Sequence, residues 1–87
     1  MKIKSTFALR NIAGNWVALP LGAATLDFNG MLTLNESGVL LWRKLEDGCT
    51  KAELIEALLS EYEVTRDEAE ADVYSFISKL ENAGCIE

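Results

Sequence analysis

The sequence predicts an α+β fold in which a three-stranded antiparallel sheet is followed by a bundle of three helices. In the first third of the 87 residues, short apolar and branched runs alternate with turn residues, a pattern typical of strands joined by hairpins. From residue 35 onward, apolar residues recur at helical spacing, and two T-x-x-E motifs stand where helices should begin. Strands that precede helices in one short chain indicate the α+β class.

Three short runs are expected to form the strands, at about 7–12, 16–21 and 31–34. The first two flank Ala13-Gly14-Asn15, where Gly-Asn favours a tight hairpin because both residues tolerate a positive φ. Pro20 cannot donate to a ladder, so it belongs at a sheet edge or at the end of its strand. Asn29-Gly30 predicts a sharp turn before the third strand, and residues 26–28 either pair as a strand or only bend back.

The first helix is expected over about 36–46, with Asn35 as its N-terminal cap and Gly48 as its C-terminal stop. One face of this helix should point into the core: Gly38, Leu41, Trp42 and Leu45. Trp16 is assigned to the core as well. Leu40 lies on the opposite side, which indicates either burial on two sides or a contact with a partner.

The T-x-x-E motifs that begin at Thr50 and Thr65 are capping boxes, and they predict helices over about 51–62 and 66–83. Gly84 ends the last helix. The apolar face of the second helix contains Leu54, Ile55, Leu58, Leu59 and Tyr62. The apolar stripe of the third contains Ala69, Val73, Phe76, Ile77 and Leu80. This stripe has two flanks, one with Glu70, Tyr74 and Glu81 and the other with Glu68, Asp72 and Lys79.

The length fits one domain, so we expect residues 1–87 to form a single unit, with strands over about 7–34 and helices over about 36–83. Residues 1–34 carry three bases and one acid, a net charge of +2, whereas residues 35–87 carry five bases and thirteen acids, a net charge of −8. The acidic segment would repel a polyphosphate partner. No run reaches the ~18 apolar residues of a membrane span, and the start lacks the apolar run of a signal peptide. We therefore expect a cytoplasmic protein without membrane contact.

The sequence does not indicate an enzyme. It contains no histidine, which removes the usual general base and the commonest metal ligand. Cys49 and Cys85 form no C-x-x-C pair, and we interpret both as reduced, small hydrophobic residues. A phosphate-binding glycine loop and a G-x-S-x-G elbow are also absent. We therefore expect no catalytic, cofactor-binding or metal-binding residues.

The alternative interpretation is a winged helix-turn-helix regulator that binds DNA, because such proteins also combine a small sheet with three helices. A DNA-binding domain needs Lys or Arg to neutralise phosphates and to contact base edges. The third helix carries Arg66 and Lys79 against five acids, a net charge of −3. These charges oppose the DNA-binding function, so no nucleic-acid partner is expected.

Three motifs in order resemble the PqqD-like family. They are LNESGVLLWRKLEDG at residues 34–48, T-x-x-E-L from Thr50, and D-V-x-x-F-I-x-x-L-x-x-A-G from Asp72. The resemblance is strong over residues 31–87 and looser in the preceding hairpin. As an ordered set these motifs are specific, whereas each alone would be only a helix cap or a core stripe. Cys85 departs from the pattern, since the family usually has an aliphatic residue there.

The resemblance implies a winged-helix-like fold and a peptide-binding function. Family members are recognition elements for ribosomally made, post-translationally modified peptides (RiPPs). They bind the leader of a precursor peptide and present it to a modifying enzyme, commonly a radical SAM protein. In the family, the leader adds as a strand to the free edge of the third strand and lies against the third helix. The peptide-binding residues implied here are Met31, Leu32, Thr33 and Leu34 in the strand and Asp72, Val73, Tyr74, Phe76 and Lys79 in the helix.

The physical properties of an incomplete sheet support the same site. An edge strand with unpaired backbone groups is a template for another extended chain, which also permits homodimerisation by edge pairing. Met31 and Thr33 are the better candidates for the peptide face, because successive side chains of a strand point to opposite sides. Taken singly, Val73 and Phe76 at helical spacing are more often core residues than contact residues. The sequence leaves open which flank of the third helix faces the peptide.

Overall fold

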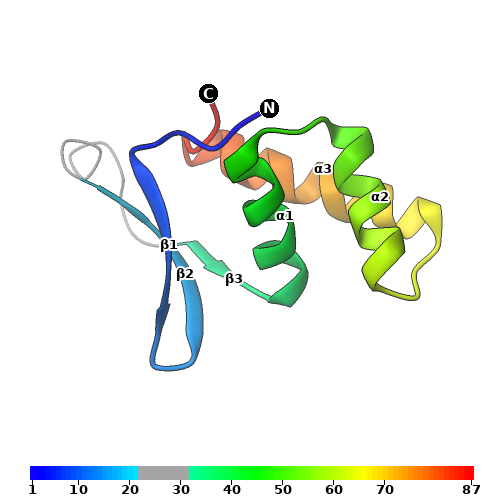
Figure 1. The fold of residues 1–87 in the computed structure, drawn as a ribbon, viewed down its shortest axis with the longest axis horizontal. Helices are drawn as coiled ribbons and strands as arrows, with labels where there is room; N and C mark the ends of the chain where they lie inside the picture. The colour runs from blue at the N-terminus through cyan, green and yellow to red at the C-terminus, as the bar shows by residue number, and fades with distance from the viewer. Residues whose placement is uncertain (22–31) are drawn as a thin grey trace.

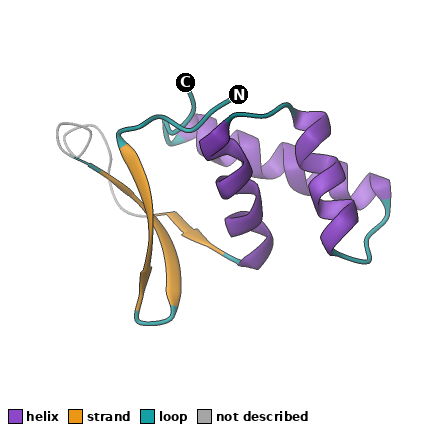
Figure 2. Ribbon diagram, in the orientation of Figure 1, coloured by secondary structure: helices purple, strands orange, loops and turns teal. Residues whose placement is uncertain are grey.

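The computed structural model describes residues 1–21 and 32–87 and confirms the predicted α+β order (Figures 1 and 2). The strands are β1 (Phe7–Ile12), β2 (Asn15–Pro20) and β3 (Leu32–Leu34). The helices are α1 (Glu36–Asp47), α2 (Lys51–Glu61) and α3 (Arg66–Asn82). The expected turn at Asn29-Gly30, the ambiguous segment 26–28 and Met31 lie outside the described residues.

The hairpin between β1 and β2 closes with a turn of two residues. Ile12 pairs with Asn15, so Ala13 and Gly14 form the turn, with φ values of 52° and 84°. A tight hairpin of this kind requires a positive φ at both central residues, because only that backbone twist matches the twist of the strands. The sequence placed Asn15 in the turn, but Asn15 is the first residue of β2, and the positive φ values occur at Ala13 and Gly14.

The sheet has the antiparallel order β1-β2-β3, and β3 leads directly into α1 (Figure 2). Trp16 pairs with Leu34 and Ala18 pairs with Leu32, so these four residues lie on the face of the sheet that packs on the helices. Asn35 alone separates β3 from α1. The short connection fixes the N-terminus of α1 beside the end of the edge strand.

The core lies between the inner face of the sheet and the three helices. Its largest fully buried side chains include Trp42, Leu45, Leu54, Val73, Ile77 and Leu80. Trp42 is buried as predicted, and its Nε1–H donates to Glu46 Oε2 at 3.3 Å. Trp16 is only half-buried, although it packs against the core, and the Arg43 guanidinium lies 5.7 Å from its ring centroid. Leu40 is half-buried against the core.

The N-terminal segment lies beside the C-terminus and closes one end of the core (Figure 1). Ile3 forms a bridge with Ile86, and its N–H donates to the Leu45 carbonyl at 3.0 Å. The Lys4 N–H donates to the Cys85 carbonyl at 2.8 Å. These bonds hold the end of α3 against the end of α1. Within the described part of the chain, no helix combines the length and apolar character needed to cross a membrane.

Candidate functional site

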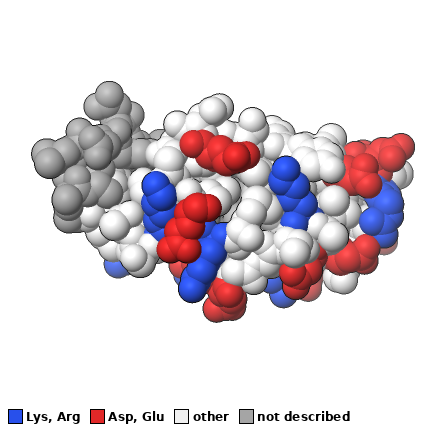
Figure 3. Space-filling model, turned by 90° about the horizontal axis from the view of Figure 1, so that it is seen from above, with Lys and Arg blue, Asp and Glu red and all other residues white. Residues whose placement is uncertain are grey.

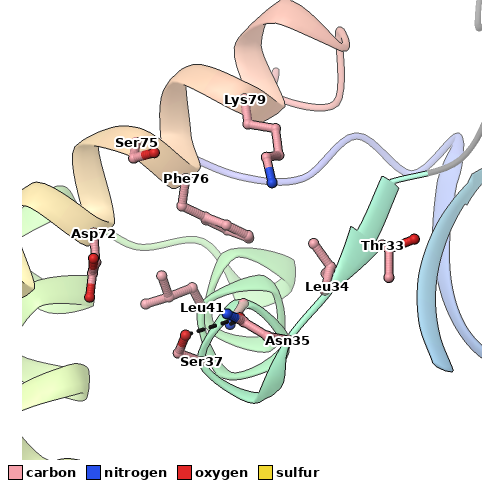
Figure 4. A pocket seen from close by; sticks show the side chains of 10 residues that line it. Thr33, Leu34, Asn35, Ser37, Leu41, Asp72, Ser75, Phe76 and Lys79 are labelled. Atoms are coloured by element: carbon pink, nitrogen blue, oxygen red, sulfur yellow. Dashed lines mark hydrogen bonds between the residues drawn. The ribbon is translucent and has the colours of Figure 1, made fainter. Parts of the chain in front are cut away.

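A groove of about 440 Å³ lies between β3 and α3, with the first turns of α1 as its floor (Figure 4). Three elements line it: Thr33 and Leu34 from β3, Asn35, Ser37, Gly38 and Leu41 from α1 and its cap, and Asp72, Ser75, Phe76 and Lys79 from α3. Among the described residues, β3 pairs only with β2. The backbone groups on its outer edge, beside this groove, therefore have no strand partner within residues 1–21 and 32–87.

The N-terminal cap of α1 shapes one end of the groove. The Asn35 carboxamide oxygen accepts the Gly38 N–H at 2.9 Å and the Ser37 hydroxyl at 3.0 Å. Asn35 has an extended backbone, with φ −83° and ψ −178°, so the chain turns into the helix within one residue. The cap thus holds the polar groups of Asn35 and Ser37 at the mouth of the groove, next to the edge strand.

Gly38 permits close packing between the floor of the groove and Phe76. A Cβ at this position would lie 3.2 Å from Asn35 Oδ1, 3.3 Å from Leu34 Cβ and 3.4 Å from Phe76 Cε1. Because a Gly inside a helix costs about 1 kcal/mol relative to Ala, its presence needs a packing reason. The close approach of the Phe76 ring and Leu34 to the α1 backbone supplies that reason.

The wall formed by α3 is apolar at its centre and charged at both ends. Phe76 is 9% exposed and, with Leu34 and Leu41, forms the apolar part of the lining. Asp72 and Lys79 are seven residues apart, which is about two helical turns. In Figure 4, Lys79 extends its ammonium group toward the β3 side of Phe76, whereas Asp72 lies on the other side of that ring. The groove therefore offers an apolar surface between an anionic and a cationic end.

The structure brings most of the predicted site residues together. Thr33 is exposed, Leu34 is buried and Leu32 is half-buried against the core. Asp72, Phe76 and Lys79 of the predicted helix set line the groove, whereas Met31 lies outside the described residues.

Two residues of the predicted helix set do not line the groove. Val73 is fully buried in the core, so its side chain is not available to a ligand. Tyr74 lies on the opposite flank of α3, is 53% exposed, and has the Lys51 Nζ 5.2 Å from its ring centroid. The Asp72 and Lys79 flank thus faces β3, and the Tyr74 flank does not.

Sequence reasoning missed the contribution of α1 to the site. Asn35 was interpreted only as a cap and Gly38 only as a core position, yet both line the groove. Ser37 and Ser75 carried no distinctive pattern. The signal that was available is Gly38 itself, because a glycine within a helix often marks the close approach of another chain segment.

The two cysteines are poorly suited to nucleophilic chemistry. Both are free thiols, and Cys85 is fully buried. Burial raises the pKa of the Cys85 thiol to about 11. Desolvation, followed by the nearby Glu53 carboxylate, also raises the pKa of Cys49 above its ordinary value. Since the thiolate is the reactive form, both environments disfavour it at neutral pH. Within the described residues, no group of three or more acidic or Cys side chains could hold a metal ion.

On the face of the molecule seen in Figure 3, the described residues form no continuous basic patch of the kind that binds DNA. On the face seen in Figure 3, basic side chains are interspersed with acidic ones. Arg66 at the start of α3 forms an ion pair with Glu56 at 2.7 Å, and this contact raises the pKa of Arg66. One of the two basic residues of α3 is therefore already paired within the protein.

Comparisons with known proteins identify a matching family model and two similar solved structures. The family model described as Coenzyme PQQ synthesis protein D (PqqD) matches residues 15–86. The structure of TbiB1 in complex with the TbiA(beta) leader peptide is 29% identical with a TM-score of 0.79, covering 100% of this chain and 95% of that chain. Lasso peptide synthetase B1 complexed with the leader peptide is 26% identical with a TM-score of 0.75, covering 97% and 93%. No curated protein sequence matches the chain.

Proposed function

The chain belongs to the PqqD family, and on this premise we propose that it is a non-catalytic chaperone for a ribosomally synthesised precursor peptide. It binds the leader segment and presents the peptide to a modifying enzyme. The free edge of β3, which faces α3 across a groove with an apolar centre, is the observation that carries this proposal. The similar structures of TbiB1 and lasso peptide synthetase B1, both in complex with leader peptides, support it.

We propose that the leader binds by adding a strand to β3. About three ladder hydrogen bonds, worth roughly 0.5–1.5 kcal/mol each, contribute less than most estimates of the association cost of roughly 4–15 kcal/mol. Side chains must therefore supply the rest. Burial of about 200–300 Å² of apolar leader surface against Phe76 and its neighbours would add roughly 5–8 kcal/mol. The apolar centre of the groove provides a surface for this contact.

The proposed function also implies a domain organisation, a partner enzyme and a cellular location. We propose that residues 1–87 act as one peptide recognition domain and that the modifying enzyme is a radical SAM protein. Two free cysteines suit a reducing compartment, which supports the cytoplasm as the location. The open edge of β3 also permits a homodimer by edge pairing, and bound leader peptide would compete with such a dimer.

An NMR titration tests the proposed function. Peptides encoded by short reading frames near the gene are added to ¹⁵N-labelled protein, and the amide shifts are mapped onto the sequence. We expect one peptide to shift the amides of Leu32–Leu34 and the groove flank of α3. Shifts confined to other surfaces, or none with any candidate, would contradict the proposal. A gel shift at low salt tests the DNA-binding alternative, because retention of DNA there would favour a regulator.

A further inference from the structure

A second cavity lies beyond the α1 end of the groove. It encloses about 380 Å³ and is lined by Asn35, Glu36, Ser37, Leu58, Tyr62, Val64 and Asp72. Its apolar part comes from the end of α2 and the following connection, with Leu58 buried and Tyr62 and Val64 half-buried. Its acidic part comes from Glu36 in the first turn of α1 and from Asp72. An apolar cavity beside two carboxylates suits an apolar side chain with a cationic side chain next to it, rather than a charged ligand alone.

The second cavity is continuous with the groove. Asn35, Ser37 and Asp72 line both spaces, so a chain that leaves the groove over the N-terminus of α1 meets the second cavity at once. Among the described residues, neither Glu36 nor Asp72 takes part in an ion pair. Their negative charge is therefore available to a cation on the same bound chain.

The direction of a bound strand follows from the sheet. β3 runs from Leu32 to Leu34 and then into α1, so the second cavity lies beyond its C-terminal end. Antiparallel pairing is slightly more stable per residue than parallel pairing, and every pair in this sheet is antiparallel. A peptide that extends the sheet in the same manner enters from the α1 end. Its residues over the second cavity are then N-terminal to those paired with β3.

We propose that the second cavity is a subsite for one large apolar side chain of the bound peptide, located N-terminal to its strand-forming residues and adjacent to a Lys or Arg. This inference rests on the proposed function and specifies the peptide class that the site accepts. The apolar side chain packs against Leu58, Tyr62 and Val64. The neighbouring cation lies near Glu36 and Asp72. The backbone hydrogen bonds to β3 do not depend on the peptide sequence. The subsite therefore provides selectivity, because it recognises an apolar side chain and a cation that lie outside the strand pairing.

A displayed library of random peptides tests the subsite, because selection from it requires no candidate ligand. Peptides of about 12 residues are suitable, since an extended chain of that length spans about 40 Å, close to the longest dimension of the protein, 39 Å. Peptides selected on the wild-type protein should shift the β3 amides. They should also share a large apolar residue beside Lys or Arg, located N-terminal to the residues that pair with β3. Replacing that apolar residue by Ala should weaken binding about tenfold to a hundredfold.

Val64→Trp provides the decisive variant, because it fills the second cavity and does not alter the lining of the groove. We expect the same Ala replacement in the peptide to change binding to this variant by less than about twofold. Ile12→Trp, at an exposed position of the hairpin, is the matched control and should retain the full effect. If peptides shift the β3 amides but bind Val64→Trp at full strength, the subsite is refuted and the proposed function stands. If no selected peptide shifts those amides, both are refuted.

Discussion

The two flanks of α3 contain similar residues but face different surroundings. The flank beside β3 carries Asp72 and Lys79 and adjoins Phe76 of the apolar stripe, and the opposite flank carries Glu70 and Tyr74. Phe76 is 9% exposed and forms the centre of the groove, whereas Tyr74 is 53% exposed and contacts Lys51 of α2. Each flank thus places charged side chains beside an aromatic ring.

The difference shows that the composition of the helix does not define the site. The two flanks differ in the element that each one faces. One flank faces the edge strand β3, and the other faces helix α2, whose backbone groups are hydrogen-bonded within the helix. An unpaired edge offers backbone donors and acceptors to an extended chain, and a helix does not. Of the two flanks of α3, we therefore expect only the one that faces β3 to contribute to peptide binding.

The largest expected effect comes from the aromatic residues of the two flanks. Phe76→Ala should lower the free energy of unfolding by about 3–5 kcal/mol, because it leaves a cavity between α1, β3 and α3. It should also abolish peptide binding. Tyr74→Ala should change the free energy of unfolding by less than about 1 kcal/mol and leave binding intact, since its ring is largely exposed. Urea unfolding and peptide titration measure the two quantities.

Because Phe76→Ala is strongly destabilising, Phe76→Leu provides a milder variant. It keeps an apolar side chain in the core, so the protein should remain folded by circular dichroism while the ring is lost from the groove. Weaker peptide binding by folded Phe76→Leu would support the claim that the β3 side of α3 forms the binding site. Unchanged binding by this variant, or an equal loss of binding in Tyr74→Ala, would contradict that claim.

Filling the groove gives the next largest effect. Gly38→Leu should lower the free energy of unfolding by about 1–3 kcal/mol, because its Cβ alone would lie only 3.3 Å from Leu34 and 3.4 Å from Phe76. The remaining side-chain atoms must enter the groove, so peptide affinity should fall by at least about tenfold. Ser78→Leu adds the same side chain at an exposed position of α3 outside the groove lining. This control should retain wild-type affinity in the same titration.

The sequence predicted the helices better than it predicted the site. Two capping boxes, at Thr50 and Thr65, are local signals, and the structure contains both. The groove depends instead on contacts between residues far apart in the chain, such as Gly38 with Phe76. Local spacing placed Val73 and Tyr74 in the candidate set beside Phe76, because neighbouring residues on a helix cannot be sorted between core, groove and outer flank until the position of β3 is known. Local spacing also does not show that Trp16, assigned to the core, packs against it only half-buried and beside Arg43 of α1.

Both flanks of α3 lie over the same core, and Cys85 is a fully buried residue of that core. The pKa of its thiol is about 11 in the folded protein, above the ordinary value of 9.0. The folded state therefore keeps a proton that the unfolded chain releases between these values. Stability is unaffected below pH 9 and should fall by about 2 kcal/mol as the pH rises to 11. Chemical unfolding across this range measures the loss.

Cys85→Ala controls for the other groups that titrate at high pH. The variant should be less stable at neutral pH because it leaves a small cavity, but it should lose less stability between pH 9 and 11 than the wild type does. An identical pH slope in both proteins would show that the thiol is not held protonated by the core. The end of α3 would then be open to solvent, and the two flanks would not share a rigid support.

The smallest expected effect on peptide affinity comes from neutralising the charged residues of the two flanks. Asp72→Asn and Lys79→Gln should each change peptide affinity by up to about fivefold, because exposed ion pairs are worth less than about 1 kcal/mol. Both changes should reduce the salt dependence of binding. Glu70→Gln on the opposite flank should alter neither quantity, although it changes the net charge as much as Asp72→Asn does. Titrations at two salt concentrations distinguish a local contact from a general effect of net charge, and an equal response of Glu70→Gln would show that the peptide senses the whole acidic surface of α3.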